Sequence, residues 1–224
     1  MDIIRKNWKY YVSVLGASSA FLAFLMMYKR LKSKPLPENL DKFIKNSSNL
    51  NPLLKSEALH RSSLISNINI KYTLFLNLRD KNTMNSEFDG TVLINFFMNK
   101  VDDVFLDFHG KIKAVTVNFK VIDVNDIKHK NDRLYLSADL LSSTNTVIIE
   151  FSSIYSVNEH GLRYSKSESF ENYIVSNFEP FYAHTMFPCF DQPDLKAKIK
   201  LLVVVNKEFE VITSSKPNFN ITHI

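Results

Sequence analysis

The sequence predicts an all-β domain, a β-sandwich or saddle, preceded by one N-terminal transmembrane helix. From about residue 66, apolar and polar residues alternate with a period of two in successive segments separated by polar turns, as in strands with one buried face. Residues 10–28 form an uncharged, mostly apolar run. At about 1.5 Å per residue this run spans roughly 28 Å, close to the ~30 Å hydrocarbon core of a bilayer. The sequence contains no G-x-G-x-x-G motif, phosphate loop or alternation of strands with helices, which argues against an α/β fold.

The first 28 residues are predicted to be a short basic leader, 1–9, and a retained membrane span, 10–28. Trp8 and Tyr28 lie at the two ends of the apolar run, where interfacial aromatic residues are common. A cleaved signal peptide is the alternative. However, the run is long for the apolar region of such a peptide, and bulky or basic residues occupy the place of a small-residue cleavage site. Basic residues flank the run on both sides, so the orientation of the span stays open.

The remaining chain is predicted to be a linker, 29–65, the β-domain, 66–217, and a tail, 218–224. Pro35 and Pro37 end any helix that continues from the span. The linker mixes short apolar pairs with Asn, Ser and Lys, and we expect one short helix in it, at about 38–45. In the first strand of the β-domain, the apolar residues from Ile68 to Leu78 occupy every second position and share one face. The predicted strands lie, in chain order, at 68–78, 88–96, 104–108, 112–121, 134–136, 146–154, 173–175 and 198–205.

Charge and cysteine content argue against a nucleic-acid-binding protein and against a cysteine nucleophile. The formal net charge of +5 is mild, and the basic residues are spread along the chain without the dense stripe of a nucleic-acid-binding protein, so no nucleic-acid partner is expected. Cys189 is the single cysteine, which rules out an intrachain disulfide. It lies between Pro188 and Phe190 in an apolar run, and this position favours a buried, structural cysteine over a nucleophile.

The stretch 178–197 is the most informative part of the chain. Its prolines fix φ and remove backbone donors, so the stretch is predicted to be a shaped loop and not a regular strand. Its phenylalanines supply the apolar area that pins the loop to the domain. Asp191 is expected to accept backbone N–H groups in the turn around Gln192-Pro193. The residues assigned this structural role are Phe178, Pro180, Phe187, Pro188, Phe190, Asp191 and Pro193.

This stretch resembles the signature that closes the N-terminal β-domain of the aminopeptidase N family of zinc metallopeptidases, peptidase family M1. Earlier segments are similar to strands of the same domain, and the likeness extends over residues 66–217. The resemblance implies the β-fold that the periodicity predicts. The segments that carry it are Tyr72-Thr73-Leu74, Phe88-Asp89-Gly90-Thr91-Val92, Gly161-Leu162-Arg163-Tyr164 and, more loosely, Ile149-Glu150-Phe151.

The catalytic motifs of the resembling enzymes do not occur in this chain. Those enzymes hold zinc with a His-Glu-x-x-His helix and a later Glu, and grip the substrate with a Gly-x-Met-Glu-Asn strand. None of the six histidines has a second His four residues away with an intervening Glu. We therefore expect no catalytic residue, metal or cofactor in these 224 residues, although a catalytic domain follows the signature in the family.

The resemblance assigns one further pair of residues. A Gln-x-Glu pair in the family helps to bind the free amine of the substrate, and the matching positions here are Asn177 and Glu179. Asn177 is one methylene shorter than the family's Gln, and His184 replaces an Arg that follows Ala in the family. We interpret the pair as a vestigial substrate-amine position, with Glu179 a solvated or structural residue.

The sequence therefore predicts a catalytically inactive, membrane-anchored structural or accessory subunit of a larger membrane complex. The small residues at 16–20 suit packing against another membrane helix, so the expected partners are other subunits, through the span and an exposed face of the β-domain, and the lipid bilayer. The mitochondrial inner membrane is favoured by analogy with short, basic, uncleaved leaders on accessory subunits of the respiratory chain. A secretory-pathway membrane is the alternative location.

Two other functions stay open. The chain is a truncated or split zinc aminopeptidase if its catalytic half is supplied elsewhere. It is a non-catalytic peptide-binding module if Glu179 and nearby aromatic residues bind a free amine.

Overall fold

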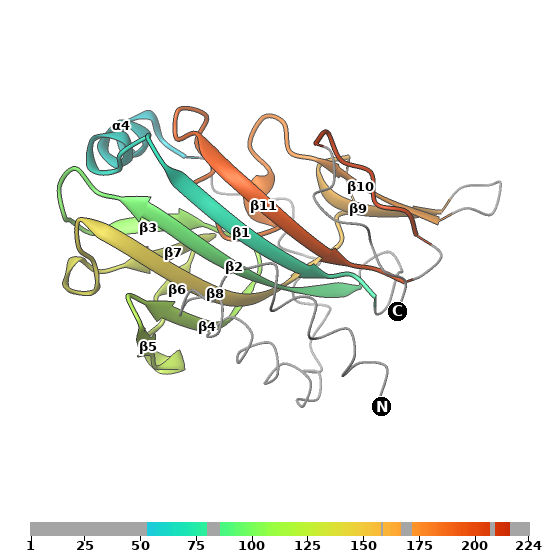
Figure 1. Ribbon diagram of the computed structural model, residues 1–224, viewed down its shortest axis with the longest axis horizontal. Helices are drawn as coiled ribbons and strands as arrows, with labels where there is room; N and C mark the ends of the chain where they lie inside the picture. Colours follow the sequence, from blue (N-terminus) through green and yellow to red (C-terminus); the bar gives the residue numbers. More distant parts are fainter. Residues whose placement is uncertain (1–52, 80–85, 158, 167–171, 207–208, 216–224) are drawn as a thin grey trace. The chain divides into compact units, whose positions relative to one another are not determined.

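A mixed sheet of six strands forms the framework of the protein in the computed structural model, which describes residues 53–79, 86–157, 159–166, 172–206 and 209–215. The spatial order of its strands is β11-β1-β2-β8-β4-β5 (Figure 1). β11 runs parallel to β1, and the other neighbours are antiparallel. The strands are β1 Ile70–Asn77, β2 Glu87–Phe97, β4 Lys111–Val117, β5 Lys120–Ile122, β8 Thr144–Ile154 and β11 Ala197–Val204.

Smaller elements cover one face of this sheet. A three-stranded sheet in the order β3-β7-β6 lies behind it in Figure 1, and a separate hairpin pairs β9 with β10. The bounds are β3 Val104–Asp107, β6 His129–Lys130, β7 Arg133–Leu136, β9 Gly161–Lys166 and β10 Asn172–Asn177. One α-helix, α4 Lys55–Leu64, and three 3-10 turns, η2 Val124–Asp126, η3 Ala138–Leu140 and η4 Ala183–Thr185, complete the described elements.

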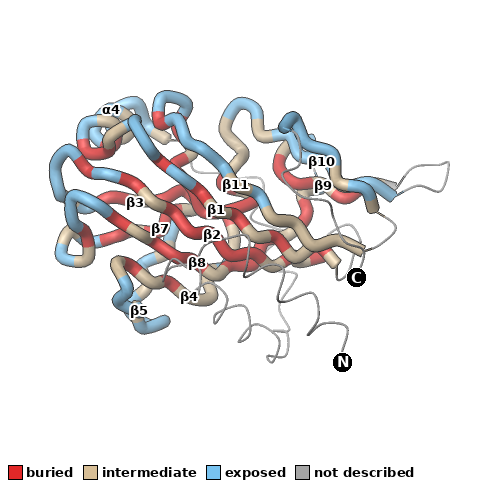
Figure 2. Tube along the Cα trace, viewed as in Figure 1, coloured by how far each residue is buried: buried red, intermediate tan, exposed pale blue. Residues whose placement is uncertain are grey.

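The described residues are thus mostly β, which confirms the predicted β-rich fold class, with one α-helix among them. The core lies between the large sheet and the smaller elements (Figure 2). In β1 the predicted alternation is correct, because Ile70, Tyr72, Leu74 and Leu76 are all buried. Ile68, predicted on the same face, is 67% exposed because it precedes the strand. Asn69 separates it from β1 with φ of 78°, a left-handed conformation that Asn tolerates.

The strand predicted at 112–121 is instead a tight hairpin. Asn118 and Phe119 have φ of 48° and 69°, and Val117 pairs with Lys120 across them, so the two residues form the loop. The Asn118 side chain stabilises this turn by donating to Leu140 O at 3.0 Å and accepting from the Thr146 N–H at 2.9 Å. Alternation of apolar residues continues across the turn, so periodicity alone does not locate it.

The helix α4 lies inside the range predicted to be a linker. Glu57 begins it by accepting the Leu54 N–H at 2.9 Å, as the acidic residue of a capping box does. Arg61 and Leu64 are buried, so the helix packs on the β-domain. The short helix predicted at 38–45 lies outside the described residues.

No helix within the described part of the chain is long and apolar enough to cross a membrane. The predicted leader, the span at 10–28 and the tail at 218–224 all lie outside that part.

Candidate functional site

The stretch singled out in the sequence, 178–197, is inserted into the core of the domain. Phe187 and Phe190 are buried, and each meets a ring of the large sheet edge-on. The Phe187 ring lies 5.8 Å from that of Tyr72, and the Phe190 ring lies 5.2 Å from that of Phe96, centroid to centroid. The Phe190 N–H also donates to the Tyr72 hydroxyl at 3.0 Å. These contacts hold the loop against the large sheet.

A buried arginine of α4 connects this loop to the rest of the domain. Arg61 is 1% exposed, and its Nη1 donates to Asp107 Oδ2 at 2.8 Å. Its Nε donates to Gln192 Oε1 at 2.9 Å. The guanidinium lies over the ring of Phe105, 4.7 Å from the centroid, a cation–π geometry. One side chain thereby joins the helix, strand β3 and residues 178–197, which we call the signature loop.

Two carboxylates, that of Asp107 beside Arg61 and that of Asp191, hold the loop backbone. Asp107 exchanges two backbone hydrogen bonds with Cys189 and accepts the Asp191 N–H at 3.0 Å on Oδ2. Asp191 in turn accepts the His184 N–H at 3.0 Å, and its Oδ2 lies 2.7 Å from His184 Nδ1. Burial raises the pKa of Asp107, and the charge and hydrogen bond of Arg61 oppose that rise. Asp191 thus accepts a backbone N–H as predicted, but from His184 and not from the turn around Gln192-Pro193.

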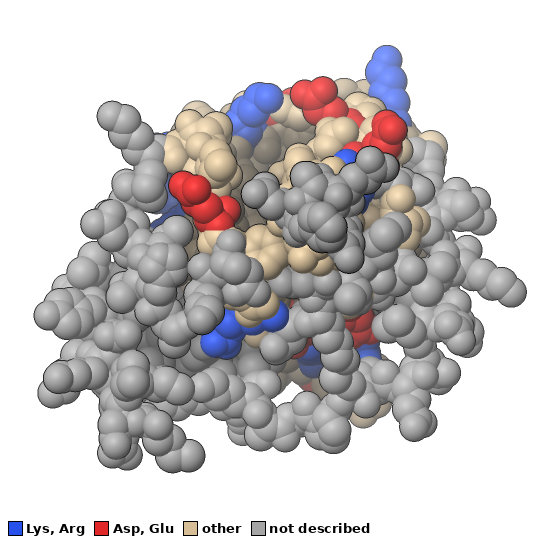
Figure 3. All heavy atoms as spheres, turned by 90° about the vertical axis from the view of Figure 1, so that its right-hand side faces the viewer, with Lys and Arg blue, Asp and Glu red and all other residues tan. Residues whose placement is uncertain are grey.

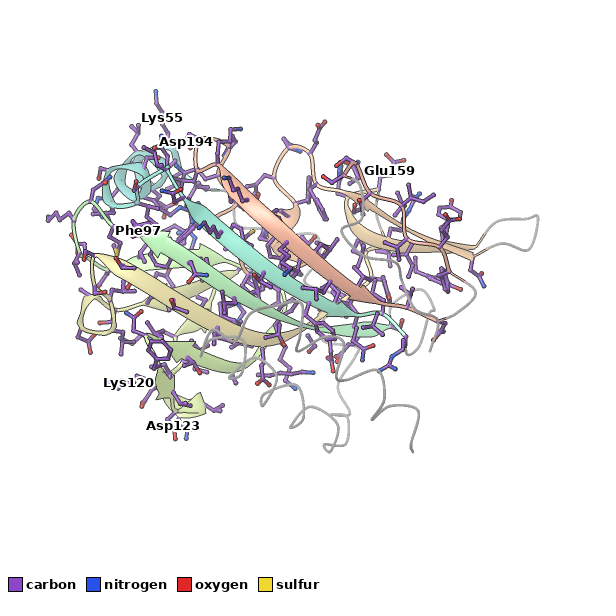
Figure 4. All side chains as sticks on the ribbon, in the orientation of Figure 1. Lys55, Phe97, Lys120, Asp123, Glu159 and Asp194 are labelled. Atoms are coloured by element: carbon purple, nitrogen blue, oxygen red, sulfur yellow. The ribbon has the colours of Figure 1, made fainter. Side chains whose placement is uncertain are left out.

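The end of the loop is tied to the exposed side of α4. Gln192 Nε2 donates to Ala58 O at 3.0 Å and to Ser62 Oγ at 2.5 Å. The Ser62 hydroxyl donates to Asp194 Oδ2 at 2.5 Å, and this bond holds the pKa of Asp194 below its usual value. Figure 4 shows Asp194 beside the helix. The helix and the loop therefore close on each other through polar side chains.

A second ion pair fixes the start of α4. Arg133 of β7 donates to both carboxylate oxygens of Glu57, at 2.5 and 2.8 Å, in a bidentate arrangement. The hydrogen bond from Arg133 lowers the pKa of Glu57. The Arg133 guanidinium also lies over the Phe105 ring, at 4.6 Å.

The other residues assigned a structural role are distributed between core and surface. Pro188 is buried with the phenylalanines, Phe178 is half-buried against the core, and Pro180 and Pro193 are exposed. Cys189 is buried, as the apolar run predicts, and burial raises the pKa of its thiol. A thiol of this kind is a weak nucleophile, because the thiolate is the reactive form.

The predicted substrate-amine residues lie apart from this cluster. Asn177 ends β10, opposite Gly161 of β9, and both Asn177 and Glu179 are exposed. The Glu179 N–H donates to Asn177 Oδ1 at 3.4 Å. Within the described residues, the Glu179 carboxylate makes no hydrogen bond or ion pair. Figure 3 shows one face of the molecule, on which the acidic and basic side chains of the described residues are interspersed.

This geometry holds the signature loop, α4 and β3 together. The structure, where it describes the chain, brings together no group of three or more His, Cys, Asp or Glu side chains able to hold a metal ion. The polar side chains that do converge bind one another in the core.

The sequence alone did not indicate the charged residues that organise the site, Arg61, Glu57, Asp107 and Arg133. No capping-box motif marks Glu57 in the sequence, because Leu54 stands where Ser or Thr opens such a motif. Arg61, four residues after Glu57, is expected on a solvated face of a helix, because charged residues are seldom fully buried.

Comparison with known proteins identifies the domain. The model of the Peptidase M1 N-terminal domain matches residues 68–222. The Probable aminopeptidase 1 of Sulfurisphaera tokodaii is 50% identical over 44 residues, 19% of this chain and 6% of that protein. The Probable M1 family aminopeptidase 1 of Encephalitozoon cuniculi is 32% identical over 84 residues, 38% of this chain and 10% of that protein. These matches therefore span only a small part of the relatives' length.

A solved structure shares the fold. The crystal structure of Legionella pneumophila aminopeptidase A in complex with aspartic acid superposes with a TM-score of 0.50 at 20% sequence identity. The superposition covers 62% of this chain and 16% of that one.

Removal of the Arg61 charge is expected to destabilise the domain strongly. Arg61→Met leaves Asp107 buried without its counter-ion, and breaking a buried pair in this way costs about 3–5 kcal/mol. Urea unfolding of the purified protein measures this loss. Adding Asp107→Asn should restore part of the stability, because the unpaired charge is then gone. If the loss of unfolding free energy in the double variant equals the sum of the two single losses, the two residues are not coupled.

The pair formed by Glu57 gives a stability difference that depends on pH. Because the pKa of Glu57 is lowered in the folded protein, its contribution is present above the ordinary carboxyl pKa of about 4.3 and is lost as pH falls through the folded value. The unfolding free energy of wild type minus that of Glu57→Gln should therefore be largest near neutral pH and shrink toward pH ~3. Asp107 titrates in both proteins, so its opposite dependence cancels. A difference that does not change with pH would contradict this assignment.

Proposed function

This chain belongs to the peptidase M1 N-terminal domain family, and we propose that it is a catalytically inactive member that serves as a structural or accessory subunit of a larger membrane protein complex. The observation that carries the proposal is that the signature loop makes its contacts within the domain. Its aromatic rings fill the core, and its polar groups are bound to α4 and β3. A fold stabilised in this way needs no substrate or metal to complete it.

The absence of the zinc motif from the sequence supports the same proposal. No His-Glu-x-x-His segment occurs in the 224 residues, so the chain lacks the two His ligands and the acid that activate water in such enzymes. Glu179, the residue matched to substrate-amine binding, is exposed and makes no polar contact through its carboxylate with the described residues.

Membrane attachment is proposed from the apolar run at 10–28. Its length matches the bilayer core, and its small residues at 16–20 suit contact with a second membrane helix. We favour the mitochondrial inner membrane and a respiratory-chain complex because the leader before the run is short and basic. The secretory-pathway membrane is the alternative.

A split zinc aminopeptidase is the second candidate, favoured by the exposed position of Glu179 just beyond the end of β10. In that case the catalytic part is supplied by other residues or another polypeptide, and Glu179 contacts the substrate amine. The two candidates make opposite predictions for the same pair of substitutions.

Glu179→Ala and Phe187→Ala separate the two functions. For a scaffold, Glu179→Ala should change the unfolding free energy by less than about 0.5 kcal/mol and leave assembly intact. Phe187→Ala should lower the unfolding free energy by about 3–5 kcal/mol through the cavity it leaves, and deplete the complex. Phe190→Ala should behave like Phe187→Ala. The readouts are urea unfolding and the cellular level of the complex.

Zinc content and release of amino acids from aminoacyl reporters by the purified complex complete this test. Stoichiometric zinc with activity that Glu179→Ala abolishes would establish the split enzyme and overturn the scaffold. Binding of a free-amine peptide that requires Glu179, without zinc or activity, would instead identify a peptide-binding module.

Assembly is tested by the size of the native protein. After extraction of membranes with a mild detergent, the chain should migrate with a much larger complex than its own mass of 25.9 kDa. Recovery from the soluble fraction, or migration as a free monomer, would contradict the proposed role.

A further inference from the structure

β11 is the longest edge strand among those that the structure describes. It pairs with β1 over eight residues without a register shift and contains no proline. The opposite edge of the same sheet, β5, has three residues, and the edge strand β6 of the small sheet has two. Short edges resist pairing with other chains, whereas a long and regular edge is a template for an added strand.

The backbone groups available at this edge can be assigned. The Leu78 N–H donates to Val204 O at 2.8 Å, so Val204 directs its peptide groups toward β1. Alternate residues of a strand direct these groups to alternate sides. Ile199, Leu201 and Val203 therefore present N–H and C=O groups to the free edge. Within the described residues, no strand pairs with them there.

Apolar side chains on the core side of the sheet become exposed to solvent at the same edge. Ile199 and Leu201 are opposite Tyr72 and Leu74 in the register, and so they lie on the core side of the sheet. Tyr72 and Leu74 are 4% and 1% exposed, whereas Ile199 and Leu201 are 58% and 41% exposed. A further strand beside β11, with apolar side chains on this side, would cover both residues.

The other side of the edge carries unpaired positive charge. Lys198 is opposite Lys71, and Lys200 follows two residues later on the same side. None of the three forms an ion pair with the described residues. Like charges directly opposite one another in a sheet are unfavourable, and an acidic neighbour would relieve that repulsion.

We propose that the free edge of β11 binds an extended segment of another polypeptide in which apolar and acidic residues alternate. The segment adds a strand to the sheet, covers Ile199 and Leu201 with its apolar side chains, and meets Lys198 and Lys200 with its acidic ones. A second copy of β11 fits less well, because it brings its own lysines. This inference rests on the proposed function in one respect, that the chain acts by holding other polypeptides, and it names the surface that does so.

The test uses the full chain in mild detergent and a fluorescent eight-residue peptide of alternating valine and glutamate, blocked at both ends. Fluorescence anisotropy measures its binding. Two control peptides are the valine–lysine analogue, which reverses the charge, and the valine–glutamate peptide with every backbone amide methylated, which cannot donate to the edge. Both controls should bind at least about tenfold more weakly than the valine–glutamate peptide.

Charge reversal on the protein supplies the matched variant. Lys198→Glu with Lys200→Glu should exchange the preference, so that the valine–lysine peptide binds more tightly than the valine–glutamate peptide. Lys120→Glu with Lys128→Glu makes the same change of net charge, with Lys120 in the opposite edge strand, and should leave the preference unchanged. Circular dichroism confirms that each variant is folded.

Equal binding of the valine–glutamate and valine–lysine peptides would overturn the proposal, as would undiminished binding of the methylated peptide. A preference that Lys198→Glu with Lys200→Glu leaves unchanged would also overturn it. These outcomes are independent of the proposed function. A chain that migrates as a monomer yet binds the valine–glutamate peptide through β11 would contradict the role in a complex and retain the docking edge.

Discussion

The buried guanidinium of Arg61 is the interaction on which the arrangement of this domain depends. It is the shared partner of Asp107 in β3 and Gln192 in the signature loop, and it belongs to the only α-helix that the structure describes. Burying a charge carries a desolvation penalty that its partners roughly offset, so such a pair adds little net stability. It does specify which surfaces meet, because any other arrangement leaves a charge unpaired in the core.

The signature sequence therefore has a structural explanation in this domain that does not involve catalysis. The loop has no regular ladder of its own, so its shape is fixed by rings inserted into the core and by carboxylates that accept its amides. Residues used in this way identify a fold, and function must be argued from the groups left at the surface. Here those groups are Glu179, beyond the end of β10, and the exposed edge of β11.

The sequence predicted the strands well because their physics is local. Burial of one face imposes a period of two, and each predicted segment overlaps a strand of the structure. The alternating pattern does not reveal the turn at Asn118-Phe119, since apolar residues continue on both sides of it. The helix α4 was missed because its main buried contact is made by an arginine, and that burial depends on Asp107 and Gln192, which are distant in sequence. The motif located the loop, but only the fold separates buried Phe187 from exposed Glu179.

The distance in sequence between these partners has a consequence for how the domain is made. Arg61 and Gln192 are 131 residues apart, and β1 pairs on one side with β11, which follows Gln192. During synthesis the N-terminal part of a chain emerges first, and contacts of high sequence separation form late. The signature loop and β11 are therefore the last partners of α4 and β1 to leave the ribosome. A nascent chain halted before the loop would expose to chaperones and proteases the edge of β1 that β11 later covers.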